Sequence, residues 1–144
     1  MTNLTAGVLL DTCAVIWLAN GDPLPAQVTA AVVLAATSAC LFVSPISAWE
    51  VGILSNPRGA RPALQFLPDP KAWFAKVMDG PGIREATLTP GIAVDASHLP
   101  GSVHGDPADR LLIATARHLG VPIITRDAKI IAYAEQGLVR VLPC

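Results

Sequence analysis

Charged side chains are scarce in this sequence of 144 residues, and neither sign predominates. Asp and Glu together number 11 and Lys and Arg number 10, so the formal net charge is only −1. A chain so nearly neutral has no global electrostatic attraction for nucleic acids. Any phosphate-bearing ligand must therefore be held by a few local cations or by metal ions.

Cysteines are also few, and their spacing matches no zinc or redox motif. Cys13, Cys40 and Cys144 include no CxxC pair, and three cysteines leave at least one unpaired in any disulfide scheme. This usage is typical of a reducing compartment. The first residues lack the basic segment and long apolar run of a secretion signal, so we expect a cytoplasmic protein. We expect Cys13 and Cys40 to fill the core.

Long apolar runs are missing too, although 52% of the residues are hydrophobic. No charged residue lies between Asp22 and Glu50, but three hydroxyl residues interrupt the apolar run over residues 28–43. A membrane-spanning helix needs about 20 apolar residues, so we expect no contact with a membrane. We predict instead a buried helix over Ala26–Ala36 and a short strand over Cys40–Val43. A helix so uniformly apolar is expected to be covered on both sides, by the core and by a second chain.

Short apolar runs alternate with helical patterns along the chain. Strands are expected around GVLL, CLFV, IREATL and VPIIT, each followed by a helical segment. This alternation predicts one α/β domain over residues 1–144 with a mostly parallel sheet. Four prolines and a glycine within Ser55–Pro70 predict a long loop before a helix around Lys71–Met78. Arg58 and Arg61 in this loop are either solvated surface charges or contacts to a nucleic-acid backbone.

The few acidic residues fall where a parallel sheet binds its ligands. Asp11 ends the first apolar strand and Asp127 follows the strand VPIIT. The carboxyl ends of the strands line the ligand crevice in parallel α/β sheets. Asp109 opens a helix that faces the same side. Glu50 joins them if its otherwise uncharged helix crosses the same edge.

Helix capping is an alternative role for three acids. Asp11, followed by Thr12, is placed to cap the helix that starts there. Asp106 precedes Pro107, the pattern of an N-cap followed by proline at the first helical position. Asp109 then lies at the third helical position, where the helix dipole and capping-box geometry favour a carboxylate.

Glu50 does not fit the capping alternative, because an unpaired carboxylate in an apolar helix is costly. Arg110 or Arg117 is one available partner, whereas a metal ion shared with Asp11 and Asp109 accounts for the whole set. Close carboxylates repel one another by roughly 3 to 4 kcal/mol per pair at an effective dielectric near 20. An all-oxygen cluster without Cys or His suits Mg²⁺ or Mn²⁺ and chemistry on phosphodiesters.

Three segments resemble the PIN-domain family, and in particular its VapC-like toxins. They are LLDTCAVIWL, SAWEVGIL and HGDPADRLLIATARHLGVPIITRD, in the order and approximate spacing of that family. The resemblance implies a three-layer α/β/α sandwich. It also implies an endoribonuclease dependent on Mg²⁺ or Mn²⁺ that serves as the toxin of a type II toxin–antitoxin pair.

The resemblance carries the catalytic and metal-binding carboxylates onto Asp11, Glu50, Asp109 and Asp127. Thr12 and Thr125 match family positions whose hydroxyls support the ligands. Asp106 and His104 lie in the same motif, and Asp106 is either a cap or a ligand.

Further expectations concern the surroundings and partners of these acids. Arg110 and Arg126 flank the acids in sequence. They either contact phosphate or, as we expect, orient the carboxylates by ion pairing. The resemblance further implies an RNA substrate, a VapB-like antitoxin that covers the crevice, and a homodimer. The apolar helix over residues 26–36 is a candidate contact for that dimer, with core burial as the competing account.

Three other interpretations of the acids stay open. A phosphatase with an aspartate nucleophile needs a second acid two residues after the first, where Cys13 stands instead. A phosphoacceptor signalling domain also gathers acids and Mg²⁺ at strand ends, but it needs a second acid beside the first and a lysine near the last strand. Leu10 and Thr12 flank Asp11 instead, and Arg126 stands near the expected lysine. A non-catalytic PIN-like binding module is the third alternative, and the presence of all four acids weighs against it.

Overall fold

Five parallel strands form one sheet in the order β3-β2-β1-β4-β5. The computed structural model describes residues 6–144; residues 1–5, which bear on the expected lack of a secretion signal, lie outside it. The strands are β1 (Val8–Leu10), β2 (Leu41–Val43), β3 (Ile83–Glu85), β4 (Ile123–Thr125) and β5 (Val141–Pro143). The predicted α/β class with a parallel sheet is confirmed.

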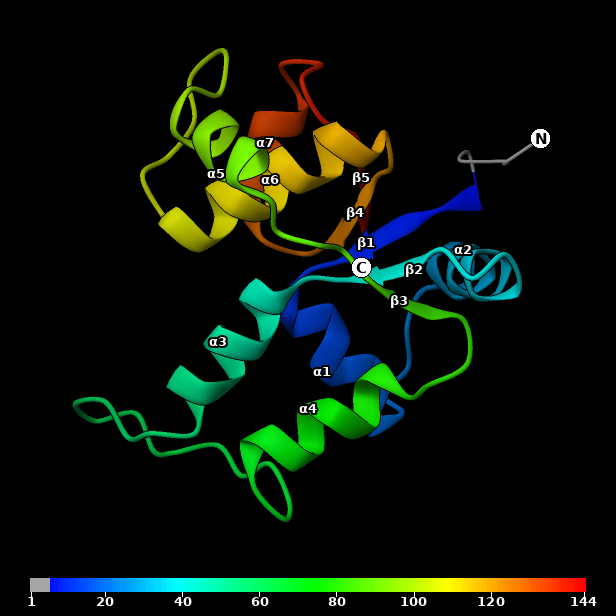
Figure 1. Ribbon diagram of the computed structural model, residues 1–144, viewed down its shortest axis with the longest axis vertical. Helices are drawn as coiled ribbons and strands as arrows, with labels where there is room; N and C mark the ends of the chain where they lie inside the picture. Colours follow the sequence, from blue (N-terminus) through cyan, green and yellow to red (C-terminus); the bar gives the residue numbers. More distant parts are fainter. Residues whose placement is uncertain (1–5) are drawn as a thin grey trace.

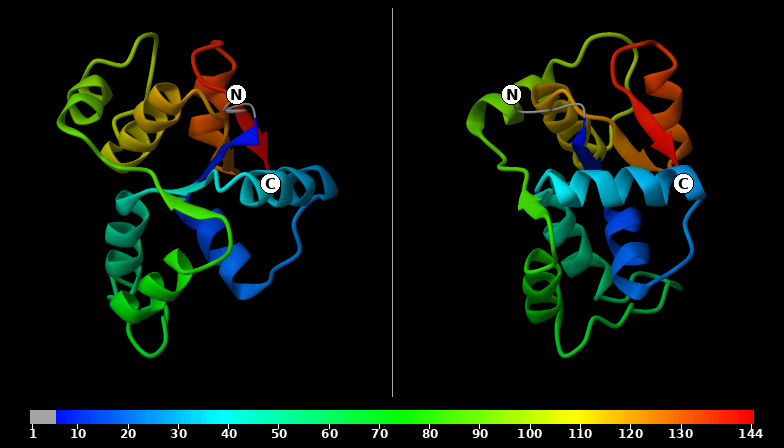
Figure 2. Two further views of the ribbon diagram at one scale, coloured as in Figure 1. Left: turned by 45° about the vertical axis from the view of Figure 1, so that its right-hand side comes forward. Right: turned by 90° about the vertical axis from the view of Figure 1, so that its right-hand side faces the viewer.

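Helices cover both faces of this sheet. They are α1 (Thr12–Asn20), α2 (Ala26–Thr37), α3 (Pro45–Leu54), α4 (Pro70–Met78), α5 (Pro90–Ser97), α6 (Pro107–Leu119) and α7 (Ala128–Ala134). Figures 1 and 2 show α5, α6 and α7 on one side, and α1, α3 and α4 on the other. The three-layer sandwich implied by the resemblance is therefore present.

The core consists of two main apolar clusters, one on each face of the sheet. Val8 and Leu10 of β1 pack with α1, α2 and α4, whereas Leu9 packs with α6 and α7. Successive side chains of a strand point to opposite faces. The central strand is therefore buried on both sides, as is usual in parallel sheets.

The strand order places a ligand crevice between β1 and β4. From β1 the chain proceeds to β2 and β3 on one side, then crosses to β4 and β5 on the other. Ligands of open α/β sheets bind outside the carboxyl ends of the strands at such a switch point. The order also differs from the 2-1-3-4-5 order of CheY-like domains, so the phosphoacceptor interpretation is not favoured.

The apolar segment before Glu50 forms the expected helix and strand, α2 and β2. One face of α2 is buried, but Val33 is 60% and Leu34 57% exposed on the other. The core therefore covers one side of this helix, and cover of the other side by a second chain stays a prediction. Among residues 6–144 we find no helix with the length and apolar character needed to cross a membrane.

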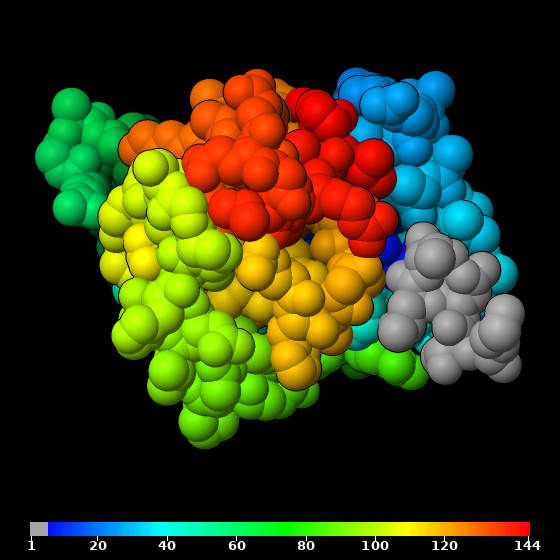
Figure 3. Space-filling model, turned by 90° about the horizontal axis from the view of Figure 1, so that it is seen from above, coloured from blue at the N-terminus to red at the C-terminus, as the bar shows by residue number. Residues whose placement is uncertain are grey.

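The predicted loop before α4 is confirmed, and it projects from the side of the molecule in Figures 1 and 3. Arg58 and Arg61 pair with each other through their backbones. The Arg61 guanidinium donates to the carbonyls of Asn56 at 3.0 Å and Leu54 at 3.3 Å. Arg61 thus stabilises the carboxyl end of α3, and Arg58 is solvent-exposed.

Candidate metal centre

Four acidic side chains lie where β1 and β4 end and where α3 and α6 approach that edge. Asp11 follows β1 and is the N-cap of α1, and Asp127 follows β4 and is the N-cap of α7. Glu50 lies on α3 and Asp109 in the first turn of α6. The Asp109 charge raises the pKa of both Asp11 and Glu50, and the Asp127 charge raises those of Asp11 and Asp109. Each of the four predicted carboxylates therefore lies within electrostatic reach of at least one other.

Burial is the main cause of raised pKa values in three of these carboxyls. Desolvation raises the pKa of Asp11, Glu50 and Asp109, and the neighbouring carboxylates raise each of them further. Hydrogen bonds from Thr125, Thr12 and His104, respectively, oppose this shift without cancelling it. The edge therefore concentrates negative charge that the chain itself does not fully neutralise.

The two oxygens of Asp11 have different partners. Oδ1 accepts the backbone N–H of Ala14 at 2.8 Å and caps α1, whereas Oδ2 accepts the hydroxyl of Thr125 at 2.5 Å. The Thr125 oxygen in turn accepts the backbone N–H of Asp127 at 2.9 Å. Capping and a site role are therefore compatible for Asp11, and Thr125 connects two of the predicted carboxylates.

Glu50 is partnered by Thr12 and not by an arginine. The Thr12 hydroxyl forms a hydrogen bond with Oε1 of Glu50 and lies 3.0 Å from the buried hydroxyl of Ser47. A hydroxyl has one proton and two lone pairs. When Thr12 donates to Glu50, Ser47 can therefore donate to Thr12, which extends the support of Glu50 into the core. Thr12 and Thr125 are thus both placed beside acids, as the resemblance implied.

The arginines near the acids have other partners, so the ion pairs expected for Arg110 and Arg126 are wrong. Nε of Arg110 donates to the carbonyl of Ala96 at 2.9 Å and ties α6 to α5. Arg117 likewise donates to a backbone carbonyl. The guanidinium of Arg126 lies over the ring of Trp17. Hydrogen bonds to carbonyls fix the first two side chains and leave them unavailable to Glu50.

Asp106 and Asp109 have separate roles. Oδ1 of Asp106 accepts the backbone N–H groups of Ala108 at 2.9 Å and Asp109 at 3.2 Å, so Asp106 is the N-cap of α6. Oδ2 of Asp109 lies 2.8 Å from Nε2 of His104. The capping role is confirmed for Asp106, but the capping-box role is wrong for Asp109, whose carboxylate turns toward His104 instead of back to the cap.

Cys13 lies at the rim of the acidic edge and is exposed, so the prediction that it fills the core is wrong. Although the residue is exposed, its thiol is partly desolvated; this desolvation and the charges of Asp11 and Glu50 raise the pKa of Cys13 to about 11. As the second residue of α1, it shares the acidic environment of the Asp11 cap. Cys40 is buried, as predicted.

The donor chemistry of this edge fits a hard divalent cation. Every donor among the four acids is a carboxylate oxygen, the ligand type that Mg²⁺ and Mn²⁺ prefer. Within residues 6–144, no three acidic, histidine or cysteine side chains form a preassembled ligand group. In this part of the chain the donor type fits such a cation, whereas the acids do not form a closed ligand set.

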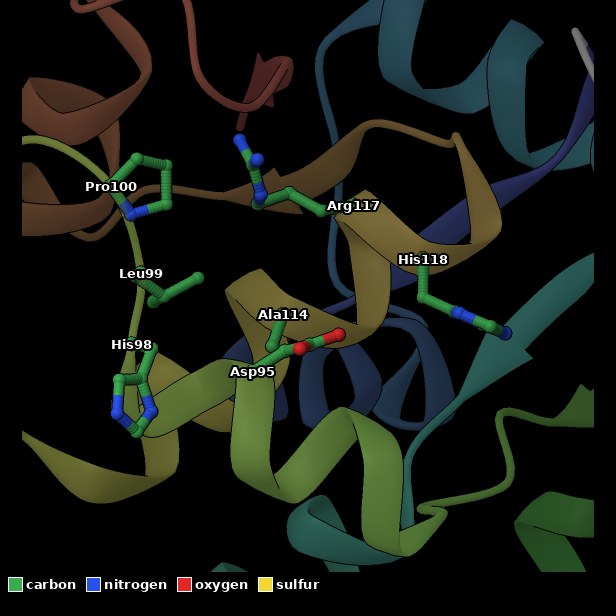
Figure 4. Close-up of a pocket in the computed structure, with 7 residues that line it drawn as sticks. All are labelled: Asp95, His98, Leu99, Pro100, Ala114, Arg117 and His118. Atoms are coloured by element: carbon green, nitrogen blue, oxygen red, sulfur yellow. The ribbon is translucent and has the colours of Figure 1, made fainter.

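A pocket of about 320 Å³ lies elsewhere, between α5 and α6. Figure 4 shows His98 and His118 on opposite sides of it, with Asp95 between them. None of the predicted acids lines this pocket. Both histidines are exposed at helix ends, and the acidic edge remains the candidate site.

Two comparisons with known proteins bear on this site. The family model of the PIN domain matches residues 8–136. The chain is 33% identical over 90 residues to a protein of Mycobacterium tuberculosis (strain ATCC 25618 / H37Rv) named Ribonuclease VapC22. The aligned part covers 62% of this chain and 65% of that relative.

Proposed function

Because this chain belongs to the PIN-domain family, we propose that it is a divalent-metal-dependent endoribonuclease and the toxin of a type II toxin–antitoxin pair. The observation that carries this proposal is the group of four carboxylates at the carboxyl ends of β1 and β4, three of them with raised pKa values. The name of the mycobacterial relative supports ribonuclease activity. Its aligned part spans less than two thirds of that relative, so activity, substrate and partner are inferred for this chain.

Asp11, Glu50, Asp109 and Asp127 would hold Mg²⁺ or Mn²⁺. The cation supplies positive charge and Lewis acidity toward a phosphodiester when it is bound. The acidic edge alone repels RNA, so substrate binding and cation binding are coupled. The reaction we propose is hydrolysis of the RNA backbone that leaves a 5′-phosphate and a 3′-hydroxyl.

The chain contributes the orientation of the carboxylates. Thr125 holds one oxygen of Asp11, Thr12 holds one oxygen of Glu50, and His104 holds one oxygen of Asp109. Each carboxylate retains acceptor lone pairs on its other oxygen. Groups that orient ligands in this way typically change metal affinity or activity 10- to 100-fold when they are removed.

RNA-end sequencing tests the proposal. Wild type and Asp11→Asn are expressed under control in matched cells, and the purified proteins are incubated with total RNA in Mn²⁺ or in EDTA. We expect new 5′-phosphate ends only with wild type in Mn²⁺. Identical end profiles for wild type and D11N would refute the ribonuclease, and RNA binding without new ends would favour the non-catalytic module.

An apolar groove of about 510 Å³ between α1, α2 and α4 suits the antitoxin partner. Leu18, Val33 and Trp73 are among its lining residues. An amphipathic helix typically fills such a groove with its apolar face. We propose that an antitoxin segment lies in this groove. The predicted cytoplasmic homodimer would place a second copy on α2 instead, and the two occupants are separable by experiment.

A further inference from the structure

Arg126 and Trp17 form a cation–π pair next to the acidic edge. Cζ of Arg126 lies 3.6 Å from the centroid of the Trp17 ring. Arg126 follows the last residue of β4 and stands between Thr125, which bonds Asp11, and Asp127. Trp17 lies on α1, the helix capped by Asp11. Figure 1 shows α1 leaving the sheet where β1 ends.

The other arginines with assigned contacts serve the backbone. Arg61, Arg110, Arg117 and Arg140 each donate to one or more backbone carbonyls. Arg126 donates to no carbonyl in the part of the chain that the structure describes, and its guanidinium lies within hydrogen-bond reach of the thiol of Cys144. A guanidinium carries five N–H donors. Most of those of Arg126 are therefore directed to solvent.

Among the described residues, Arg126 also forms no ion pair with a carboxylate. Arg126 neighbours Asp127 in sequence. Its charge lowers the pKa of Cys13, whereas the charges of Asp11 and Asp127 raise that pKa. Yet residues 6–144 contain an ion pair only between His104 and Asp109. Stacking on Trp17 thus holds an exposed cation beside the carboxylates without neutralising them.

We propose that Arg126, positioned by Trp17, binds the RNA phosphate adjacent to the scissile one. A planar guanidinium matches the oxygens of a phosphodiester and is pre-organised when it is stacked on an aromatic ring. In a protein with a net charge of −1, a fixed local cation is needed to hold the strand across the acidic edge. This inference rests on the proposed ribonuclease function. It adds that Arg126 and Trp17 position the RNA substrate.

The first experiment compares Arg126→Ala and Arg126→Lys with Lys71→Ala, an exposed cation on α4 that controls for the loss of one charge. Cleavage of a single-stranded RNA oligonucleotide in Mn²⁺ is measured over a range of salt. R126A should raise KM roughly tenfold with little change in kcat, and reduce the salt slope of log KM by about 0.7. R126K should restore the wild-type salt slope but should reverse only part of the increase in KM. An unchanged KM and salt slope in R126A would overturn the inference.

The second experiment tests positioning by the ring. Trp17→Leu keeps an apolar side chain on α1 but removes the aromatic face, and Trp17→Phe keeps a ring. W17L should raise KM in the wild-type background and have no further effect in R126A, because the two residues act as a unit. W17F should be the milder variant. Additive effects of W17L and R126A would show that Trp17 acts through packing alone and would overturn the pairing.

A binding assay distinguishes failure of this inference from failure of the ribonuclease proposal. Anisotropy of the same fluorescent RNA is measured in Mn²⁺, so that the acidic edge can hold its cation, and a gel confirms that the RNA stays intact. If wild type produces no RNA ends, weaker and less salt-dependent binding by R126A still supports the phosphate contact. Equal binding by wild type and R126A in that case overturns it.

Discussion

The hydroxyl of Thr125 donates a hydrogen bond to Oδ2 of Asp11 across 114 positions of sequence. Both residues are buried, and the same hydroxyl accepts the backbone N–H of Asp127. The ends of β1 and β4 are thus joined by a side chain in addition to the backbone pairing of the two strands. This connection fixes the separation of two of the four proposed ligands.

Replacing Thr125 by Val should therefore disable the site more than it destabilises the fold. Val keeps the shape but removes the donor to Asp11, and a lost hydrogen bond to a charged group costs about 1.5 to 3 kcal/mol. We expect RNA cleavage to fall about 10- to 100-fold. Thr125→Ser, which retains the hydroxyl, should stay within a few-fold of wild type. Equal activity of T125V and T125S, with both proteins folded by circular dichroism, would contradict this role.

Neutralising Asp109 should have opposite effects on stability without and with cation. In EDTA, Asp109→Asn relieves repulsion with the neighbouring carboxylates and can still form a hydrogen bond with His104. The Tm should therefore rise by roughly 3 °C for each kcal/mol gained in the free energy of unfolding. In saturating Mn²⁺ the wild type gains binding energy that the variant lacks, and the order should reverse. Differential scanning calorimetry measures both conditions. Asp22→Asn, at an exposed site after α1, is the control and should leave the Tm unchanged in each.

The pH dependence of stability follows from the same raised pKa values. A carboxyl whose pKa is higher in the folded state binds its proton more tightly there, so the destabilisation from its charge is complete above the folded pKa and lost as pH falls. In EDTA the wild type should therefore gain stability relative to Asp11→Asn as pH falls from neutral toward the ordinary carboxyl pKa of 3.8. This variant leaves the contact between His104 and Asp109 in place. Taking this difference cancels the titration of the exposed histidines. A difference that stays constant over this range would contradict the charged cluster.

The fold and the acidic edge could be predicted because both follow from local pattern. Alternating apolar runs and helical segments specify a parallel sheet. Acids that directly follow strands lie at its carboxyl edge, independent of the conformation of the loops. Asp11 and Asp127 belong to this class, and Asp106 was recognisable as a cap from Pro107 alone. The strand β5 was missed because Val141–Pro143 is a short edge strand that ends in proline and lacks the length of an apolar run.

The partners of the charged side chains could not be predicted, because each depends on where a loop or a distant helix passes. The bond between Glu50 and Thr12 requires α3 to pack against the start of α1. The contact of Asp109 with His104 requires the segment before α6 to fold back on its first turn. Arg126 flanks Asp127 in sequence, yet the ring of Trp17 attracts its guanidinium. Sequence adjacency is therefore a poor guide to ion pairing at this edge.

A charge placed in the apolar groove should separate the two partners proposed for α2. Val33 lines the groove and is 60% exposed, and Val94 on α5 is equally exposed but lies outside the groove. Val33→Glu should weaken inhibition of RNA cleavage by the cognate antitoxin about 100-fold, because a carboxylate would be buried against apolar side chains. Val94→Glu, which adds the same charge, should leave inhibition unchanged. Both variants should cleave RNA like wild type, because neither position belongs to the acidic edge.

Light scattering of the free proteins gives the complementary result: a wild-type dimer that becomes monomeric only in V33E would assign the groove to a second copy and exclude the antitoxin as its occupant.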